Sequence, residues 1–354
     1  MNSNRNIVLP AVMGNSRTRQ EVMGEIRNNP GTYAVFKNLR EESQEEFIEF
    51  CMGVRGMKMT YDTFFKYIFD AEVHPERLES LLSEIIGRPL KIMRELRKEG
   101  RRITEEASLV IMDLIVEFDT GEVADVEIQK FGYLFPGERA SCYASDLMMR
   151  QYEREKNLRG DKFNYRDLKK VYTIVIMENS SKEFKMCPDS YIHRGEWKFD
   201  TNLRLNLLQE FYFIPLDIFL ELEDNKDNEV LGKELEAWLY FIGSDRPEHI
   251  CKVIQSFPKF EEIYRDIEYF RYHPKEAVGM FSEALRIMDE NTVKYMIDEQ
   301  AQTIKELTQR IDEQAQRIDE QAQRIDEQAQ TINEQAQIIR EQADQIEERD
   351  KRIK

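Results

Sequence analysis

The sequence contains few cysteines and few histidines, four of each among 354 residues, and they lie far apart in the chain. No C-x-x-C or H-x-x-x-H pair occurs, so the sequence predicts neither a zinc site of those types nor a disulfide framework. The shortage of cysteine favours a reducing compartment, and we expect a cytoplasmic protein.

Long apolar runs are also missing. No stretch approaches the ~18 consecutive apolar residues of a membrane-spanning helix. Residues 1–18 lack the continuous apolar segment of a secretory signal. The sequence therefore predicts neither membrane insertion nor export.

Positive charge is in the minority. The chain has 68 acidic and 51 basic residues, a net charge of −17, which argues against indiscriminate binding to nucleic acid, because such binding needs a basic surface. Lysine and arginine are nevertheless concentrated in residues 88–102 and 150–170. Each stretch either contacts phosphate locally or forms a solvated helix face, and the charge balance does not decide between the two.

The spacing of apolar residues predicts an α/β core. Apolar residues at helical spacing predict helices within residues 41–53, 61–70, 74–90 and 136–155, and we expect the first to end at Gly53 and the third at Gly87. Shorter, more continuous apolar segments predict strands over residues 107–118, 122–131 and 171–178. The first two strands flank Asp119-Thr120-Gly121 and indicate a β-hairpin. We expect residues 203–222 to add a strand or two, residues 229–296 to be helical, and residues 1–40 to be loosely structured.

Isoleucine recurs every seven residues from Ile297 to Ile353, and a second column, which starts at Ala301 and lies four residues later, is mostly alanine. This heptad seam predicts a left-handed coiled coil over residues 297–354, ~87 Å long as a helix. We expect it to assemble the chain into a homo-oligomer. Because alanine buries little area and identical repeats allow the register to slip, the alternative is a solvated single helix or a partly disordered tail.

One candidate site lies on the predicted hairpin. Asp113 is a carboxylate inside an otherwise apolar strand, and such a residue usually has a cation or a metal as its partner. Glu127 lies on the next strand, and Gln129 shares its face. Oxygen donors on neighbouring strands suit Mg²⁺, which would lower the pKa of an attacking water. The alternative is that Asp113 pairs with a lysine or arginine and Glu127 is an ordinary strand residue.

The loop of the hairpin predicts how these acids face each other. A three-residue loop, Asp119-Thr120-Gly121, would pair Phe118 with Glu122 and would place Gly121 in the left-handed region. Asp113 would then lie directly opposite Glu127, Ile115 opposite Asp125, and Ile111 opposite Gln129. A two-residue loop would instead place the two acids on opposite faces.

Four segments, taken together and in this order, carry a resemblance to a known family. They are YDTFFKYIF (61–69), MDLIVEF-DTGEVADVEIQK (112–130), a helix with Arg139 and Tyr143, and LKKVYTIVIME (168–178). As a set they resemble the PD-(D/E)XK nuclease superfamily, and in detail its transposase-like branch, the recombination-promoting nuclease and putative transposase family. The resemblance covers roughly residues 45–290. It implies a restriction-endonuclease-like core at residues 41–222, with a helical extension at 223–296 and the coiled coil behind it.

The resemblance also implies roles for individual residues. Asp113 and Glu127 match the metal-binding acids of the superfamily, with Mg²⁺ or Mn²⁺ as the cofactor. Gln129 stands where many members have a lysine, and an amide can hydrogen-bond the attacking water but cannot take its proton. Lys66, Arg139 and Tyr143 are candidate phosphate contacts, the last two sharing a helix face. A salt bridge and a packed ring are the alternatives for Arg139 and Tyr143.

The function implied is a Mg²⁺-dependent DNA endonuclease in a recombination or mobile-element setting, with DNA as partner and Asp113, Glu127 and Gln129 as its active-site residues. The alternative is a catalytically silent nuclease-fold scaffold, or a DNA- or protein-binding module, that the coiled coil assembles. Gln129, the net charge and the long tail favour that alternative. A ribonuclease-H-like transposase with two aspartates and a distant glutamate fits poorly, because both acids lie on one hairpin.

Overall fold

A computed structural model describes residues 17–96, 113–132, 135–201, 203–226, 228 and 230–353. The chain divides into two compact units, Met1–Glu290 and Asn291–Lys354. In the described part of the chain, none of the helices is long and apolar enough to span a membrane.

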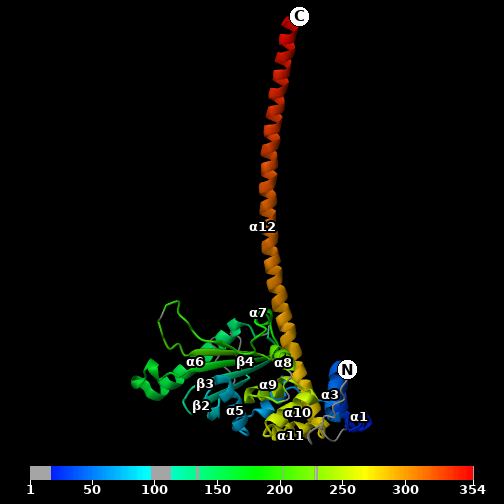
Figure 1. The fold of residues 1–354 in the computed structure, drawn as a ribbon, viewed down its shortest axis with the longest axis vertical. Helices are drawn as coiled ribbons and strands as arrows, with labels where there is room; N and C mark the ends of the chain where they lie inside the picture. Colours follow the sequence, from blue (N-terminus) through cyan, green and yellow to red (C-terminus); the bar gives the residue numbers. More distant parts are fainter. Residues whose placement is uncertain are drawn as a thin grey trace. The chain divides into compact units, whose positions relative to one another are not determined.

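The first unit is built around a six-stranded mixed sheet with strand order β1-β2-β3-β4-β6-β5 (Figure 1). Its strands are β1 (Ile92–Glu95), β2 (Leu114–Phe118), β3 (Val123–Phe131), β4 (Val171–Asn179), β5 (His193–Gly195) and β6 (Gln209–Pro215). The central strands β3, β4 and β6 are parallel, whereas the pairs β1/β2, β2/β3 and β5/β6 are antiparallel. The predicted mixed α/β class is therefore confirmed.

The α-helices described are α1 (Arg19–Asn28), α2 (Pro30–Lys37), α3 (Glu41–Met52), α4 (Asp62–Ile68), α5 (Pro75–Ile86), α6 (Gly137–Arg159), α7 (Lys182–Lys185), α8 (Leu216–Asp224), α9 (Glu234–Gly243), α10 (Pro247–Ser256), α11 (Phe260–Arg271) and α12 (Pro274–Ile353). Helices of the first unit cover both faces of the sheet. The face that carries Val126 packs into the larger core, with α4, α5 and α9. The face that carries Val123 forms a smaller core with α6.

The predicted helices of the first half form because each has an apolar stripe that packs against the core. Two of them also have a glycine that terminates the helix. Both α3 and α5 end at a glycine in the left-handed conformation, Gly53 (φ 77°) and Gly87 (φ 82°). Glycine carries no Cβ and adopts that conformation without strain. The predicted ends of these two helices are thus confirmed.

The expectation that residues 1–40 are loosely structured is wrong for residues 19–37, which form α1 and α2; residues 1–16 lie outside the described part. Thr18 and Glu21 form a reciprocal cap at the start of α1. The side chain of Asn29 caps α2, and Pro30 occupies its first turn. These caps satisfy N–H groups that would otherwise have no partner.

Residues 203–222 add one strand, β6, within the expected one or two. The strand is followed by α8, because Pro215 has no N–H to continue a ladder. The short edge strands β1 and β5 were not predicted, since three or four half-exposed residues show no apolar alternation. The helices after residue 223 share the core of the sheet, where Trp238 lies 5.5 Å from Phe69 between ring centroids.

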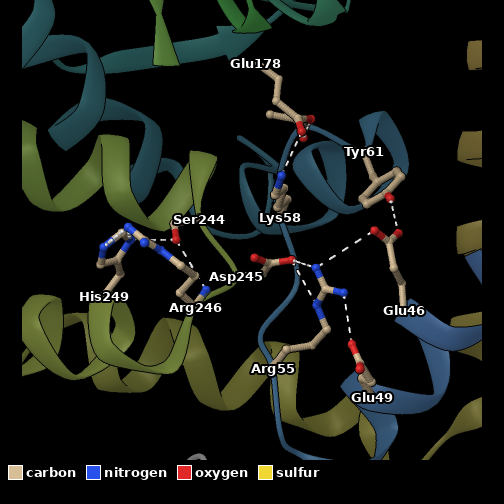
Figure 2. Close-up of polar contacts among 11 residues, drawn as sticks. Glu46, Glu49, Arg55, Lys58, Tyr61, Glu178, Ser244, Asp245, Arg246 and His249 are labelled. Atoms are coloured by element: carbon tan, nitrogen blue, oxygen red, sulfur yellow. Dashed lines mark hydrogen bonds and ion pairs between the residues drawn. The ribbon is translucent and has the colours of Figure 1, made fainter. Parts of the chain in front are cut away.

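A group of ion pairs joins the segment after α3 to the turn between α9 and α10 (Figure 2). The guanidinium of Arg55 donates from Nη1 to Glu49 at 3.1 Å and from Nε to Asp245 at 3.0 Å. Beside it, the Nζ of Lys58 lies 2.8 Å from Glu178 at the end of β4. These pairs hold the loop that leads into α4, and α4 supplies a residue to the site described below.

In the same region His249 is buried next to a positive charge. Its Nδ1 lies 2.7 Å from the Ser244 hydroxyl and its Nε2 lies 3.0 Å from Asp224 (Figure 2 shows Ser244, Arg246 and His249). Burial, followed by the charge of Arg246, lowers the pKa of His249 to about 4. The folded protein therefore binds fewer protons here than the unfolded chain, in which the pKa is 6.5.

Stability should therefore be complete above pH 6.5 and should decline as the pH falls toward about 4, since only the unfolded chain takes up this proton. We expect His249→Gln to flatten this decline in urea unfolding curves measured at several pH values. His74→Gln, at a partly exposed histidine, is the control and should leave the slope unchanged. Equal slopes for wild type and His249→Gln would contradict the prediction.

Candidate metal centre

The β2–β3 hairpin has the predicted register. Leu114 pairs with Val126 and Ile115 with Asp125. In the loop, the N–H of Phe118 donates to the Glu122 carbonyl at 2.9 Å, and Gly121 has φ 80°. The three-residue loop with a left-handed Gly121 is therefore confirmed. The expected pairing of Ile111 with Gln129 lies outside the described residues.

The same register brings Asp113 and Glu127 together, because each carboxylate hydrogen-bonds to the backbone of the other strand. Glu127 Oε1 accepts from the Asp113 N–H at 2.9 Å. Asp113 Oδ2 accepts from the Ile128 N–H at 3.1 Å. The two side chains thus lie on the same sheet face, at the start of β2. Asp113 is 20% exposed, so the pair can be reached from solvent.

The apolar surroundings of Asp113 and Glu127 raise the pKa of both carboxyl groups. Glu127 is almost completely buried. Burial, together with the charges of Asp113 and Asp125, raises its pKa well above the usual range. The pKa of Asp113 is also raised by burial, although the nearby charge of Lys66 opposes that effect. A bound cation would relieve this repulsion, since it stabilises the ionised form of every carboxylate around it.

Asp125 is the third carboxylate of this face; from the sequence it could be either a further acid near the metal or an ordinary residue at the start of a strand. It lies two residues before Glu127 on β3 and is completely buried, and within the described part of the chain neither of its carboxylate oxygens has a hydrogen-bond partner. The neighbouring residue on β4 is Thr173, whose hydroxyl is also buried without a partner. Buried polar atoms are normally satisfied, so these groups are suited to a water or a cation. The sequence feature that points to Asp125 is the alternation of side chains along the strand, which places Asp125 on the same face as Glu127.

Lys66 lies beside the hairpin. From α4, its Nζ lies 3.2 Å from Asp113 Oδ1 and 2.6 Å from Asp62 Oδ1. Asp113 therefore pairs with a lysine, which is the alternative to a metal site that the sequence left open. It does not exclude a metal, because Asp113 has a second carboxylate oxygen on the side of Glu127.

The remaining candidates surround the same face. Gln129 donates from Nε2 to Glu127 Oε2 at 3.3 Å. On α6, Arg139 donates from Nη2 to the Tyr143 hydroxyl at 2.7 Å, and its guanidinium stacks on Phe135 at 4.6 Å from the ring centroid. The charge of Arg139 opposes the rise in the pKa of Glu127, so it acts on the acid pair across the helix–sheet interface. The structure brings all the predicted site residues to one region.

The donor set suits a small, hard cation. Carboxylate oxygens are the ligands that Mg²⁺ and Mn²⁺ prefer. In the described residues, no three or more His, Cys, Asp or Glu side chains are grouped so as to hold a metal ion. Asp113 and Glu127 would therefore need water and phosphate oxygens to complete the coordination, which is usual for Mg²⁺.

The unpartnered carboxylate of Asp125 predicts a stability effect. Burial and the charge of Asp113 raise its pKa well above the ordinary 3.8, so the metal-free fold loses stability as the pH rises above that value. We expect Asp125→Asn to raise the free energy of unfolding in EDTA at pH 8 by about 1–3 kcal/mol, the cost of an unsatisfied buried group. The gain should shrink toward pH 5. Urea unfolding measures it, with the exposed Asp161→Asn as control; a destabilised Asp125→Asn would contradict the prediction.

Comparison with known proteins agrees with this geometry. A family model described as PD-(D/E)XK nuclease family transposase matches residues 59–306, well over half of the chain. No match was found among curated proteins or among solved structures. The matched range contains α4, the hairpin, α6 and β4, the elements that form the site. The chain therefore belongs to the PD-(D/E)XK nuclease family transposases.

Proposed function

We propose that the protein is a divalent-metal-dependent DNA endonuclease that hydrolyses phosphodiester bonds and acts in recombination or with mobile elements. The observation that supports this most is the pairing of Asp113 with Glu127 across the hairpin. Membership of a nuclease family supports nuclease chemistry and a link to mobile elements. The proposed enzyme requires a divalent metal, acts on DNA and works in the cytoplasm.

Asp113 and Glu127 would hold the cation, Mg²⁺ or Mn²⁺. When bound, the cation would polarise the phosphate and lower the pKa of the attacking water. Gln129 keeps Glu127 in place through its amide and offers a hydrogen bond to that water. In the reaction the water oxygen bonds to phosphorus, the bond from phosphorus to the sugar oxygen breaks, and one water proton passes to solvent while the leaving oxygen is protonated.

Arg139 and Tyr143 would contact the DNA backbone. They share one face of α6 next to the acid pair, and their mutual hydrogen bond keeps the guanidinium oriented. A guanidinium can donate to two phosphate oxygens at once, which positions the strand. Two basic stretches of the chain, residues 88–102 and 150–170, would supply local positive charge on a protein that is acidic overall.

The tail would assemble the protein into a homo-oligomer. In the second unit the described isoleucines of the heptad column, such as Ile311, Ile318 and Ile325, are 62–64% exposed in the single chain. A regular column of exposed isoleucine on a helical segment without glycine or proline, residues 297–353, is suited to a partner helix. The same tail supports the second candidate function, a silent scaffold assembled by its coiled coil, and Gln129 is the residue that favours it.

Plasmid cleavage tests the nuclease. Full-length protein should nick or cut plasmid DNA in Mg²⁺ or Mn²⁺, and Asp113→Asn or Glu127→Gln should lower the rate by about 100-fold or more, because the two acids form one metal site. Asp161→Asn, at an exposed acid, should cleave like wild type, and thermal melts should show that all variants fold. Wild-type rates for both site variants would refute the assignment. A wild type that is inactive in both metals would favour the scaffold.

Light scattering tests the tail. Truncation after Glu290 should leave a folded domain of lower oligomeric state. In the full chain, Ile318→Asp with Ile325→Asp should have the same effect, because charge on the seam opposes helix pairing. Gln316→Asp with Gln323→Asp adds equal charge two residues away, on the outer face, and should leave the stoichiometry unchanged. If truncated and full-length proteins have the same stoichiometry, the tail is not the assembly element.

A further inference from the structure

The candidate site has three carboxylates but no lysine at the position that the nuclease pattern favours. Position 129 is glutamine, whose side chain is neutral. The next residue, Lys130, cannot replace it, because successive residues of a strand point to opposite faces. Its Nζ lies over the Tyr61 ring at 4.7 Å from the centroid, on the side of the larger core. Strand β3 therefore supplies no positive charge to its own acidic face.

A positive charge reaches the site from α4 instead. Lys66 Nζ lies 3.2 Å from Asp113 Oδ1 and 2.6 Å from Asp62 Oδ1. The helix is anchored by Phe64 and Phe65, both completely buried, so the direction of the lysine is set by packing. Lys66 itself is 31% exposed and is accessible to a bound strand. An ammonium group has three N–H donors, and two acidic partners leave one for a phosphate oxygen.

We propose that Lys66 supplies from α4 the positive charge that Gln129 does not supply from β3, and that it stabilises the negative charge that builds up on the phosphate during cleavage. The inference rests on the proposed nuclease function. A fixed cation next to a metal ligand is well placed for this role, because it needs no reorganisation as the charge develops. What matters is the location of the ammonium group in space, whichever element carries it.

A purely structural role is the competing explanation, since Lys66 also neutralises Asp113. The two roles differ in what they predict for metal binding. If Lys66 only holds Asp113 in place, its loss should weaken metal binding along with cleavage, typically by about 10–100-fold. If Lys66 acts on the phosphate, cleavage should fall while the acids still bind the metal. A lysine placed at position 129 should then compensate, because the amide there already lies 3.3 Å from Glu127 Oε2.

The test compares wild type, Lys66→Met, Gln129→Lys and the double variant, all as full-length protein. Plasmid cleavage in Mn²⁺ gives the rate, and calorimetric titration with Mn²⁺ in the absence of DNA gives the affinity. Lys259→Met is the control, because Lys259 is 50% exposed and pairs with Glu234, which takes no part in the site. It should change neither quantity.

For Lys66→Met we expect about 100-fold slower cleavage, as for the loss of one donor to a developing charge. Its Mn²⁺ affinity should stay within about threefold of wild type, short of the loss expected for a structural role. The double variant should regain about tenfold of the lost rate. Wild-type cleavage by Lys66→Met, or joint loss of binding and cleavage without recovery in the double variant, would overturn the inference alone. An inactive wild type would overturn the nuclease proposal and the inference with it.

Discussion

The register of the β2–β3 hairpin determines which side chains meet in this protein. With three loop residues and Gly121 at φ 80°, Asp113 lies opposite Glu127, and both carboxylates reach the backbone of the opposite strand. A shift of one residue would send them to opposite faces. The same register places Asp125 on the sheet face that packs against α6, where it is buried and, among the residues described, has no hydrogen-bond partner. Other groups in the site offset part of the resulting concentration of negative charge.

Two kinds of group offset that charge in the metal-free protein. Backbone N–H groups bind the carboxylates of Asp113 and Glu127, and Lys66 and Arg139 lower their pKa values against the effect of burial. At Asp125, burial and the charge of Asp113 outweigh the opposing charges of Arg139 and Arg150, so its pKa is raised well above the ordinary value. Burying this carboxylate therefore costs the metal-free fold free energy. Carboxylates whose pKa values are perturbed by burial and by each other's charge are concentrated at functional sites.

The hairpin was predictable because its signals are local: a loop with glycine in the right place, and alternation along β3. The ends of α3 and α5 at Gly53 and Gly87 were predictable for the same reason. The position of Lys66 was not, because it depends on how α4 packs against a strand that lies more than forty residues away in the chain. The caps of α1 and α2 were present in the sequence, at Thr18 and Asn29, but the short helices that they start bury few apolar residues.

We propose that Asp113 and Glu127 together hold one cation. A crystal structure of the full-length protein grown with Mn²⁺, with diffraction data collected at the manganese absorption edge, would locate that ion. We expect an anomalous peak about 2.1 Å from oxygens of both carboxylates, with water completing the coordination. An ion bound elsewhere, or Lys66 alone between the acids at saturating Mn²⁺, would show that the two acids do not form a cation site.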